Sequence, residues 1–387
     1  MEDVWEKVKA YIRYAVRCVD PVLFFSVTAL GILSIVTILG AVDNFGMSKL
    51  KMQVAMFLVG TVATVVIATL DFRVIVDKLW LPFFLGSVGL LGITLIWGKS
   101  GVSMETGNKS WLQIPMVGLM IQPSEFVKFA FICTFSRHLF LVRDRINHPK
   151  SVAGLALHAG IIVALILKSG DLGVALVYLA IIAMMLFCAG LHLGYFGGGT
   201  VALVLLSPYL WEKLAFYQQR RIIVGFNPEL DPQGKGYQPL LSRRAISHGG
   251  FFGRGLFSGG YYESLDASHT DFIFATICEK FGFVGGLLVI VTFCVIVVRI
   301  FRIARIANNS DYGGLICAGV GAMFLAQILE NLGMALAMLP VVGITLPFLS
   351  CGGSSMLATF LMMGLVHSVY AHSNAVRSSV TLNALGS

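Results

Sequence analysis

Charged residues are scarce in this chain. Asp, Glu, Lys and Arg make up only 12% of its 387 residues, whereas 57% are hydrophobic and the mean hydropathy is +0.84. A soluble domain carries about 25% charged residues, so this composition excludes an ordinary globular protein. It predicts an all-α, polytopic membrane protein that forms a single domain over residues 1–387.

Paired cysteine motifs are absent. The seven cysteines lie in or beside apolar segments, and no two of them have the C-x-x-C spacing. A disulfide framework or a cysteine-based zinc site would need such a pattern. We therefore predict buried, reduced thiols and no metal site.

The N-terminus lacks the features of a cleavable signal. Residues 1–20, "MEDVWEKVKAYIRYAVRCVD", are charged through most of their length and have no small-residue cleavage site. Apolar side chains recur on one helical face, at Val4, Trp5, Val8, Tyr11, Ile12 and Ala15. This pattern predicts an amphipathic helix over residues 1–19 that lies on the cytoplasmic surface of the membrane.

Long apolar runs fill most of the remaining sequence. A membrane-spanning helix needs about 20 apolar residues, which predicts ten spans. They are residues 21–42, 50–70, 79–98, 118–141, 152–168, 172–190, 194–210, 272–298, 312–336 and 346–371.

Basic residues indicate the orientation of these spans. With a cytoplasmic N-terminus, Lys and Arg collect in the cytoplasmic segments, as the positive-inside rule requires. These residues are Lys7, Lys9, Arg13, Arg17, Arg73, Lys78, Arg137, Arg143, Arg145, Lys150, Arg299, Arg302, Arg305 and Arg377. We expect both termini in the cytoplasm and a large extracytoplasmic loop, residues 211–271, between the seventh and eighth spans.

This loop breaks the charge pattern, since it carries seven basic and six acidic residues. Long loops are largely exempt from the positive-inside rule, so a solvated loop is one interpretation. The alternative is a segment at the membrane interface beside an anionic ligand, because basic and apolar residues alternate in "LLSRRAISHGGFFGRGLF". Guanidinium groups bind phosphate through two hydrogen bonds, so phosphate is the ligand we expect.

Polar residues also interrupt the apolar sequence on the outer side near Lys109 and Trp111. After them, "QPSEFVK" places Gln122 and Ser124 close to Glu125 and Lys128. The last two lie three residues apart on one helical face and can pair. Contact with a ligand is the alternative, since ionisable groups at membrane depth are often functional.

Three further patches follow. Asp171 interrupts an apolar run, either as a helix cap or as a cavity residue. "FNPELDPQGKGYQ", which ends at Gln238, predicts turns. "LPFLSCGGSS", which contains Ser354, predicts irregular backbone that lines a cavity at the start of the last span.

Asp271 lies in "SHTDFIF", directly before the eighth span. Ser268 and Asp271 have the spacing of a capping box, so a helix cap is one interpretation. The other is chemistry at the outer membrane surface, at the end of the one outer loop rich in arginine.

In their order along the chain, these patches resemble the SEDS family (shape, elongation, division and sporulation proteins), which includes RodA and FtsW. The resemblance runs from about residue 20 to 371. It is carried by "NKSW", "QPSEFVK", "GDLGVAL", "FNPELDPQGKGYQ", "HTDFIFA", "NLGM" and "LPFLSCGGSS", and several of these are closer to RodA than to FtsW.

The resemblance implies ten transmembrane helices in the bacterial cytoplasmic membrane and a peptidoglycan glycosyltransferase that polymerises lipid II for elongation or sporulation. It also implies a complex with a class B penicillin-binding protein, and no nucleic acid. The family's catalytic aspartate matches Asp271, its outer-loop tryptophan matches Trp111, and its Glu–Lys pair matches Glu125 and Lys128.

The sequence departs from the family pattern at several places. Cys351 stands where the family has Tyr in "SYGGSS", "SHGG" replaces "GSGG", and Glu279-Lys280 replaces the usual pair of glutamates. A non-catalytic scaffold for the penicillin-binding protein therefore remains an alternative. A transporter, such as a lipid II flippase, is the other alternative.

The reaction that the resemblance implies suggests roles for the polar residues. A sugar hydroxyl attacks the anomeric carbon of a second lipid II with inversion, so one base can suffice because pyrophosphate is a good leaving group. We expect Asp271 to be that base. We expect the substrate to contact Lys109, Trp111, Arg221, Gln238, Arg243, Arg244, Arg254 and Ser354, with a divalent cation (Mg²⁺ or Mn²⁺) as an optional cofactor. Gln122, Ser124, Glu125, Lys128, Asp171 and Glu279 are expected to shape the cavity.

Overall fold

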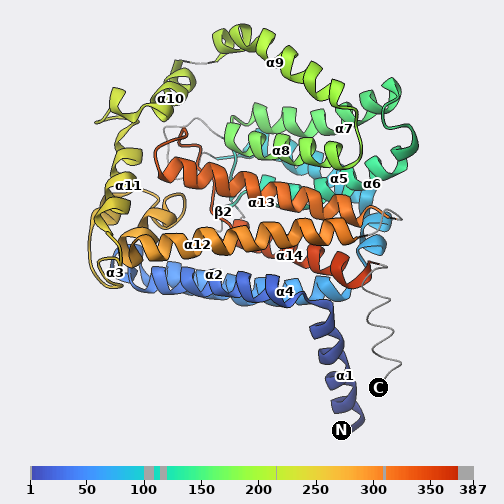
Figure 1. The fold of residues 1–387 in the computed structure, drawn as a ribbon, viewed down its shortest axis with the longest axis horizontal. Coiled ribbons are helices and arrows are strands. Elements are labelled where there is room, and N and C mark those ends of the chain that lie inside the picture. Colours follow the sequence, from blue (N-terminus) through green and yellow to red (C-terminus); the bar gives the residue numbers. More distant parts are fainter. Residues whose placement is uncertain (1, 100–108, 114–119, 215, 308–310, 374–387) are drawn as a thin grey trace.

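The computed structural model describes the whole chain except residues 1, 100–108, 114–119, 215, 308–310 and 374–387. Most of the described part is helical (Figure 1). Its α-helices are α1 (Glu2–Cys18), α2 (Pro21–Leu39), α3 (Val42–Phe45), α4 (Met47–Thr69), α5 (Phe72–Trp97), α6 (Pro123–Leu141), α7 (Pro149–Lys168), α8 (Leu172–Cys188), α9 (Leu193–Lys213), α10 (Phe216–Phe226), α11 (Tyr237–His248), α12 (Ile273–Ile306), α13 (Gly313–Ala335) and α14 (Gly353–His372).

Short elements complete the described part. Three 3₁₀ helices are η2 (Arg143–Arg145), η3 (Pro228–Leu230) and η4 (Tyr261–Ser264). Two strands, β1 (Leu112–Gln113) and β2 (Met120–Ile121), pair antiparallel just before α6, with Leu112 opposite Ile121.

Each predicted span overlaps one helix, namely α2, α4 to α9 and α12 to α14. Seven of these helices are long and apolar enough to cross a membrane, and α8 and α9 contain shorter apolar stretches. Helix α6 carries Glu125, Lys128 and Arg137 within its 19 residues, which lowers its hydropathy. The chain is thus a multi-pass membrane protein, whereas the count of ten spans stays a prediction.

Local sequence explains where several of these helices begin. Asp20 and Asp71 cap α2 and α5 by accepting hydrogen bonds from the backbone amides of Leu23 and Arg73. Proline occupies the first turn of α2, α6 and α7, where its missing amide hydrogen costs nothing. The last predicted span differs from its helix: α14 starts only at Gly353, and residues 340–352 are irregular.

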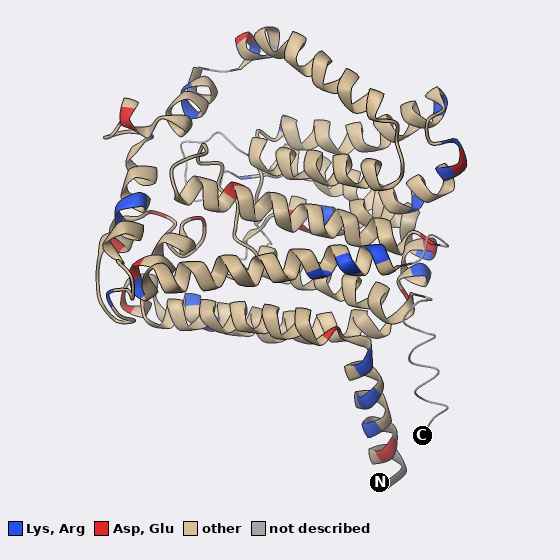
Figure 2. Cartoon of the chain, in the orientation of Figure 1, with Lys and Arg blue, Asp and Glu red and all other residues tan. Residues whose placement is uncertain are grey.

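Helices α13 and α14 form the centre of the bundle and are the most buried spans, whereas α4 and α5 expose apolar side chains over most of their length. Helix α9 lies apart from the other helices (Figure 1), and nearly all of its described side chains are exposed. Most charged residues lie towards the ends of the bundle and outside it (Figure 2). This distribution leaves apolar side chains to face lipid.

The extracytoplasmic loop predicted over residues 211–271 is largely folded. It contains α10, η3, α11 and η4, and α11 packs on α12. The buried Ser242 of α11 donates a hydrogen bond to the carbonyl of Ala335 at the end of α13, 2.7 Å away. Arg243 and Arg244 lie on the exposed side of α11.

Helix α12 is broken at Gly282, whose φ of 70° and ψ of −165° are not helical. The segment 250–255 lies against the break and bonds the backbone groups that it frees. Phe283 and Val284 donate to the carbonyls of Gly250 and Phe251, and Arg254 and Gly255 donate to those of Glu279 and Lys280. The break is therefore satisfied by protein, as membrane-depth backbone must be.

We expect Gly282→Ala to destabilise the protein by about 1–3 kcal/mol, because a Cβ at this positive φ is strained and would clash with the backbone nitrogen of Gly253. Unfolding in detergent measures the change. Gly86→Ala, in an open position of α5, is the control and should not destabilise. Equal unfolding midpoints for both variants would contradict the strain argument.

Helix α1 extends away from the bundle, across the direction of the spans (Figure 1). Ala15 and Cys18 are buried against the bundle, whereas Trp5 and Val16 are exposed. Within the predicted range 1–19, Glu2–Cys18 thus forms a helix, and its place on the membrane surface stays a prediction. Arg377 of the orientation argument lies outside the described residues.

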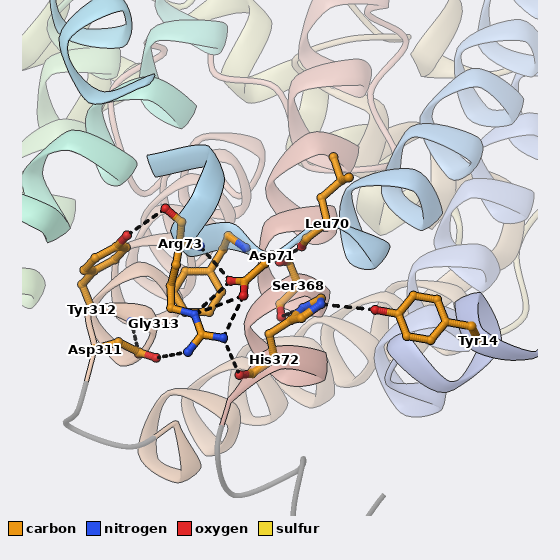
Figure 3. A network of polar contacts seen from close by, with 10 residues as sticks. Tyr14, Leu70, Asp71, Arg73, Asp311, Tyr312, Gly313, Ser368 and His372 are labelled. Atoms are coloured by element: carbon orange, nitrogen blue, oxygen red, sulfur yellow. Dashed lines mark hydrogen bonds and ion pairs between the residues drawn. The ribbon is translucent and has the colours of Figure 1, made fainter. Parts of the chain in front are cut away.

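A polar network joins α1 to the end of the bundle where α5 begins and α14 ends (Figure 3). The hydroxyl of Tyr14 lies 3.4 Å from His372 Nε2 at the end of α14. Arg73 pairs with Asp71 at 2.8 Å and with Asp311 at 3.6 Å, which connects the start of α5 with the segment before α13. Ser368 bridges the backbone across this end, accepting from the amide of Phe72 and donating to the carbonyl of Leu70.

Candidate active site

Asp271 lies two residues before the first residue of α12 and does not cap it. The N-cap residue is Phe272, and no side chain makes a capping bond there. The capping-box interpretation is therefore wrong. The reason is local: Thr270 and Phe272 both donate their backbone amides to the carbonyl of Ala267, which has a φ of 40°, so tight turns replace the first helical turn.

The carboxyl of Asp271 is partly buried, and burial raises its pKa from the ordinary value of 3.8 to about 6. The hydroxyl of Thr270 and the charge of Arg221 oppose this rise, whereas the charge of Asp171 adds to it. Asp271 is thus ionised at neutral pH and more basic than an exposed aspartate. These are the properties that a general base needs.

The charge of Arg221, on α10, acts on this carboxyl. Its Nε donates to the carbonyl of Val341 at 2.6 Å, and Gly225, one turn further along α10, lies directly against Pro340. The same 340–343 segment passes Asp271: a Cβ on Gly343 would lie 3.4 Å from Asp271 Oδ2. The 340–343 segment therefore joins Arg221 and Asp271 in one site.

The other predicted substrate contacts are distributed around this site. Lys109 is exposed and donates its backbone amide to the carbonyl of Ser169, and Trp111 is half-buried and bridges to Lys99. Arg254 is exposed, with Nε bonded to the carbonyl of His248 at 2.7 Å. Their contact with substrate stays a prediction, as does that of Arg243 and Arg244.

Gln238 has a different environment. Its amide nitrogen donates to Asp266 Oδ2 at 2.9 Å, and its amide oxygen accepts from the backbone amide of Asp266 at 3.1 Å. Both ends of the side chain therefore brace the turn between η4 and Asp271. Both polar atoms of the Gln238 side chain are therefore used in contacts within the protein.

A second polar cluster lies between α6, α8 and α14. Asp171 caps α8 through the amide of Val174 and also accepts from Gln122 Nε2 at 3.3 Å. The backbone amide of Gln122 in turn donates to Ser354 Oγ at 3.4 Å. Burial raises the pKa of Asp171, and its charge reaches Asp271, so this cluster and the Asp271 site are electrostatically linked.

Glu125 and Lys128 form a buried ion pair within α6, with 2.7 Å between Oε1 and Nζ. Their side chains are only 6% and 1% exposed. The carbonyl of Ser124, one residue before Glu125, accepts from the hydroxyl of Tyr178 on α8. The pairing predicted from the spacing is confirmed.

Glu279 lies away from Asp271, beside the break in α12. Its carboxylate accepts from the backbone amides of Tyr261 and Tyr262, and His248 Nδ1 lies 2.6 Å from it. The adjacent Lys280 donates to the carbonyls of Gly40 and Leu256. Both residues hold the 249–262 segment in place.

Three residues near the site were given no individual role from the sequence. Asn331 donates to the carbonyls of both Asp271 and Ile344, and Ser350 donates to that of Thr270. Glu330 is half-buried near the charges of Lys128 and Asp171, and its Oε2 has no hydrogen-bond partner among the described residues. A lone acid in the apolar run "FLAQILENLGMAL" is the signal that could have identified Glu330.

Comparisons with known proteins agree with this architecture. The family model FTSW_RODA_SPOVE, described as "Cell cycle protein", matches residues 16–375. The chain is 35% identical to the "Probable peptidoglycan glycosyltransferase FtsW" of Trichlorobacter lovleyi, covering 91% of this chain and 93% of that protein. It is 31% identical to the "Peptidoglycan glycosyltransferase MrdB" of Escherichia coli, covering 93% and 96%.

A solved structure is also similar. It is described as "Structural coordination of polymerization and crosslinking by a peptidoglycan synthase complex", and the match has a TM-score of 0.78 and 29% identity over 91% of this chain and 97% of that one. Relatives of both the FtsW and the RodA type match, so a place closer to RodA stays a prediction. Since the family model spans most of the chain and a relative is 35% identical over nearly its full length, the chain belongs to the SEDS family of FtsW, RodA and SpoVE proteins.

Proposed function

We propose that this protein is a peptidoglycan glycosyltransferase that polymerises lipid II into glycan strands, with Asp271 as the general base. Membership of a family whose relatives are named as peptidoglycan glycosyltransferases supports the reaction class. The observation that carries the assignment of the base is the geometry of Asp271. Its carboxyl caps no helix, lies against Gly343 within range of the Arg221 charge, and has its pKa raised to about 6 by burial.

The reaction joins two lipid II molecules. The carboxylate of Asp271 removes the proton of the 4-hydroxyl of the acceptor sugar as this oxygen attacks the anomeric carbon of the donor. The bond from that carbon to the lipid pyrophosphate breaks, and the configuration changes from α to β. Arg221 stabilises the negative charge of the leaving pyrophosphate, together with Lys109, Arg243, Arg244 and Arg254.

The membrane orientation that suits this reaction has ten spans, with α1 at the cytoplasmic surface. Helix α12 begins at the end of the bundle that carries α11, opposite the end that α1 joins (Figure 1). Arg299, Arg302 and Arg305 lie in the last turns of α12, towards the α1 end. The positive-inside rule then assigns the α1 end to the cytoplasm and the Asp271 site to the outer face.

A class B penicillin-binding protein is the partner that we propose. The similar solved structure belongs to a complex that coordinates polymerisation and crosslinking. A glycosyltransferase supplies only the first of these two activities, so a transpeptidase must supply the second.

The substrate pyrophosphate offers a divalent cation better ligands than the described side chains of this protein do. Among the described residues, no three His, Cys, Asp or Glu side chains converge on one point. Mg²⁺ usually binds through one or two carboxylates together with substrate phosphates. A cation would therefore arrive with the pyrophosphate, and no step of the proposed reaction depends on it.

Labelled lipid II in detergent tests the proposed function. The purified protein, with its penicillin-binding protein partner, should produce glycan strands. Detergent removes the two compartments that a flippase needs, so strands formed there cannot arise from transport. Lipid II that stays monomeric with a folded complex would instead support a transporter or a scaffold.

Arg221→Ala should lower kcat/KM for lipid II by about 10- to 150-fold, since one charge-assisted contact to phosphate contributes about 1.5–3 kcal/mol. It should also raise the pKa of Asp271, because the Arg221 charge lowers it. The acid limb of the pH–rate profile then moves to higher pH. An unchanged profile and kcat/KM would remove Arg221 from the site.

A further inference from the structure

The irregular segment between α13 and α14 contacts the backbone on which Asp271 is carried. Cys351 donates its backbone amide to the carbonyl of His269 at 2.8 Å, and Ser350 Oγ donates to the carbonyl of Thr270 at 2.6 Å. Asn331 Nδ2, from the last turns of α13, donates to the carbonyl of Asp271 itself at 2.8 Å. Three consecutive carbonyls, at residues 269, 270 and 271, are therefore held by donors from α13 and from the irregular segment that follows it.

Two of these donors are themselves held by the segment. Ser350 Oγ accepts the backbone amide of Leu346 at 2.7 Å while it donates to Thr270. Asn331 Nδ2 also donates to the carbonyl of Ile344 at 2.7 Å. Ser350 and Asn331 are 2% and 0% exposed, so water cannot readily replace these bonds.

Backbone strain is concentrated in the same region. The described non-glycine residues with positive φ are Ala267, Ala337 and Phe348, with values of 40°, 56° and 62°. Ala267 lies in the turns before Asp271, and the other two lie between α13 and α14. Such conformations cost about 1–3 kcal/mol each and persist only where surrounding contacts hold them.

We propose that Ser350 and Asn331 are positioning residues for the glycosyltransferase reaction, which fix the backbone of residues 270–271 and thereby the direction of the Asp271 carboxylate. The inference rests on the proposed function of Asp271 as the base. A base must meet the acceptor hydroxyl within hydrogen-bond reach. Because Asp271 precedes α12, the helix does not hold it, and the contacts from Asn331 of α13 and from the 344–351 segment take over that role.

The test uses the full-length protein with its partner and labelled lipid II. Ser350→Ala should lower kcat about 10-fold, the effect of a small misplacement of a catalytic group, and leave KM within about twofold. The matched control is Ser368→Ala. Ser368 is also buried and also bridges a backbone amide and a carbonyl, those of Phe72 and Leu70, but at the end of the bundle near α1 (Figure 3). It should lose comparable stability and keep its kcat.

A double-mutant cycle separates positioning from general damage. Asp271→Glu moves the carboxylate out of its fixed place, so Ser350→Ala should reduce kcat less than twofold further in that background. Equal reductions in both backgrounds, or an equal loss in Ser368→Ala, would overturn the proposal. Asn331→Leu, which keeps the number and branching of the side-chain heavy atoms, provides the same comparison if Ser350→Ala does not fold. An inactive wild-type complex would instead refute the proposed function itself.

Discussion

Asp271→Asn should reduce lipid II polymerisation by at least about 100-fold, because general base catalysis contributes about 10²–10⁴-fold. Asparagine keeps the volume and polarity of the side chain but does not accept a proton at neutral pH. The bonds that hold this segment go to the carbonyls of residues 269–271, so they persist in the variant. The expected loss is therefore one of chemistry, and it appears as a fall in kcat for labelled lipid II.

The pH dependence of the wild-type protein checks the same assignment. Asp271 acts only when deprotonated, and burial raises its pKa to about 6. Activity should therefore fall as the pH drops through about 6, well above the ordinary aspartate value of 3.8. A profile that stays flat down to pH 4.5 would contradict Asp271 as the base.

Asp231→Asn is a suitable control for the loss of one carboxylate. Asp231 lies in the same outer segment, after η3, and accepts the backbone amide of Lys235 in a turn that asparagine also supports. This variant should polymerise lipid II at the wild-type rate. Near wild-type activity of a folded, membrane-inserted Asp271→Asn protein would show that another group removes the proton.

The second large effect is on stability. Lys128→Met should destabilise the protein by about 3–5 kcal/mol, since removal of one partner leaves the buried charge of the other without compensation. Lys128 is paired with Glu125 at 2.7 Å, and both side chains are almost fully buried. Unfolding of the purified protein in detergent measures the difference.

Two comparisons isolate the pair. Glu125→Gln combined with Lys128→Met removes both charges, so the double variant should recover most of the lost free energy. Lys9→Met breaks the Glu6–Lys9 pair, which has the same i,i+3 spacing but is exposed on α1. It should cost less than about 1 kcal/mol. Equal costs for Lys9→Met and Lys128→Met would mean that burial does not govern the value of the Glu125–Lys128 pair.

The prediction of ten spans shows how much of the helix arrangement can be predicted from apolar runs alone. Each predicted span overlaps one helix, because about 20 apolar residues in succession have few other stable arrangements. The weaker boundaries are explained by polar residues. In α6, the charged residues Glu125, Lys128 and Arg137 lower the mean hydropathy. Residues 346–352 of the last predicted span are irregular because they bond to the segment that carries Asp271.

The sequence by itself determined the membrane class, the family and the identity of the residue that we propose as the base. These follow from composition, from apolar runs and from motifs that lie in order along the chain. The Glu125–Lys128 pair could also be predicted, since its two members are neighbours on one helix.

Only the tertiary structure decided what surrounds Asp271. Ser268 and Asp271 have the spacing of a capping box, yet the positive φ of Ala267 forms turns that end before α12 begins. Arg221, Asn331 and Ser350 are 50 to 79 residues away in sequence, and they meet Asp271 through the folding of α10, α13 and the 340–351 segment. The pKa of a carboxyl depends on such through-space neighbours and on burial, which no local pattern encodes.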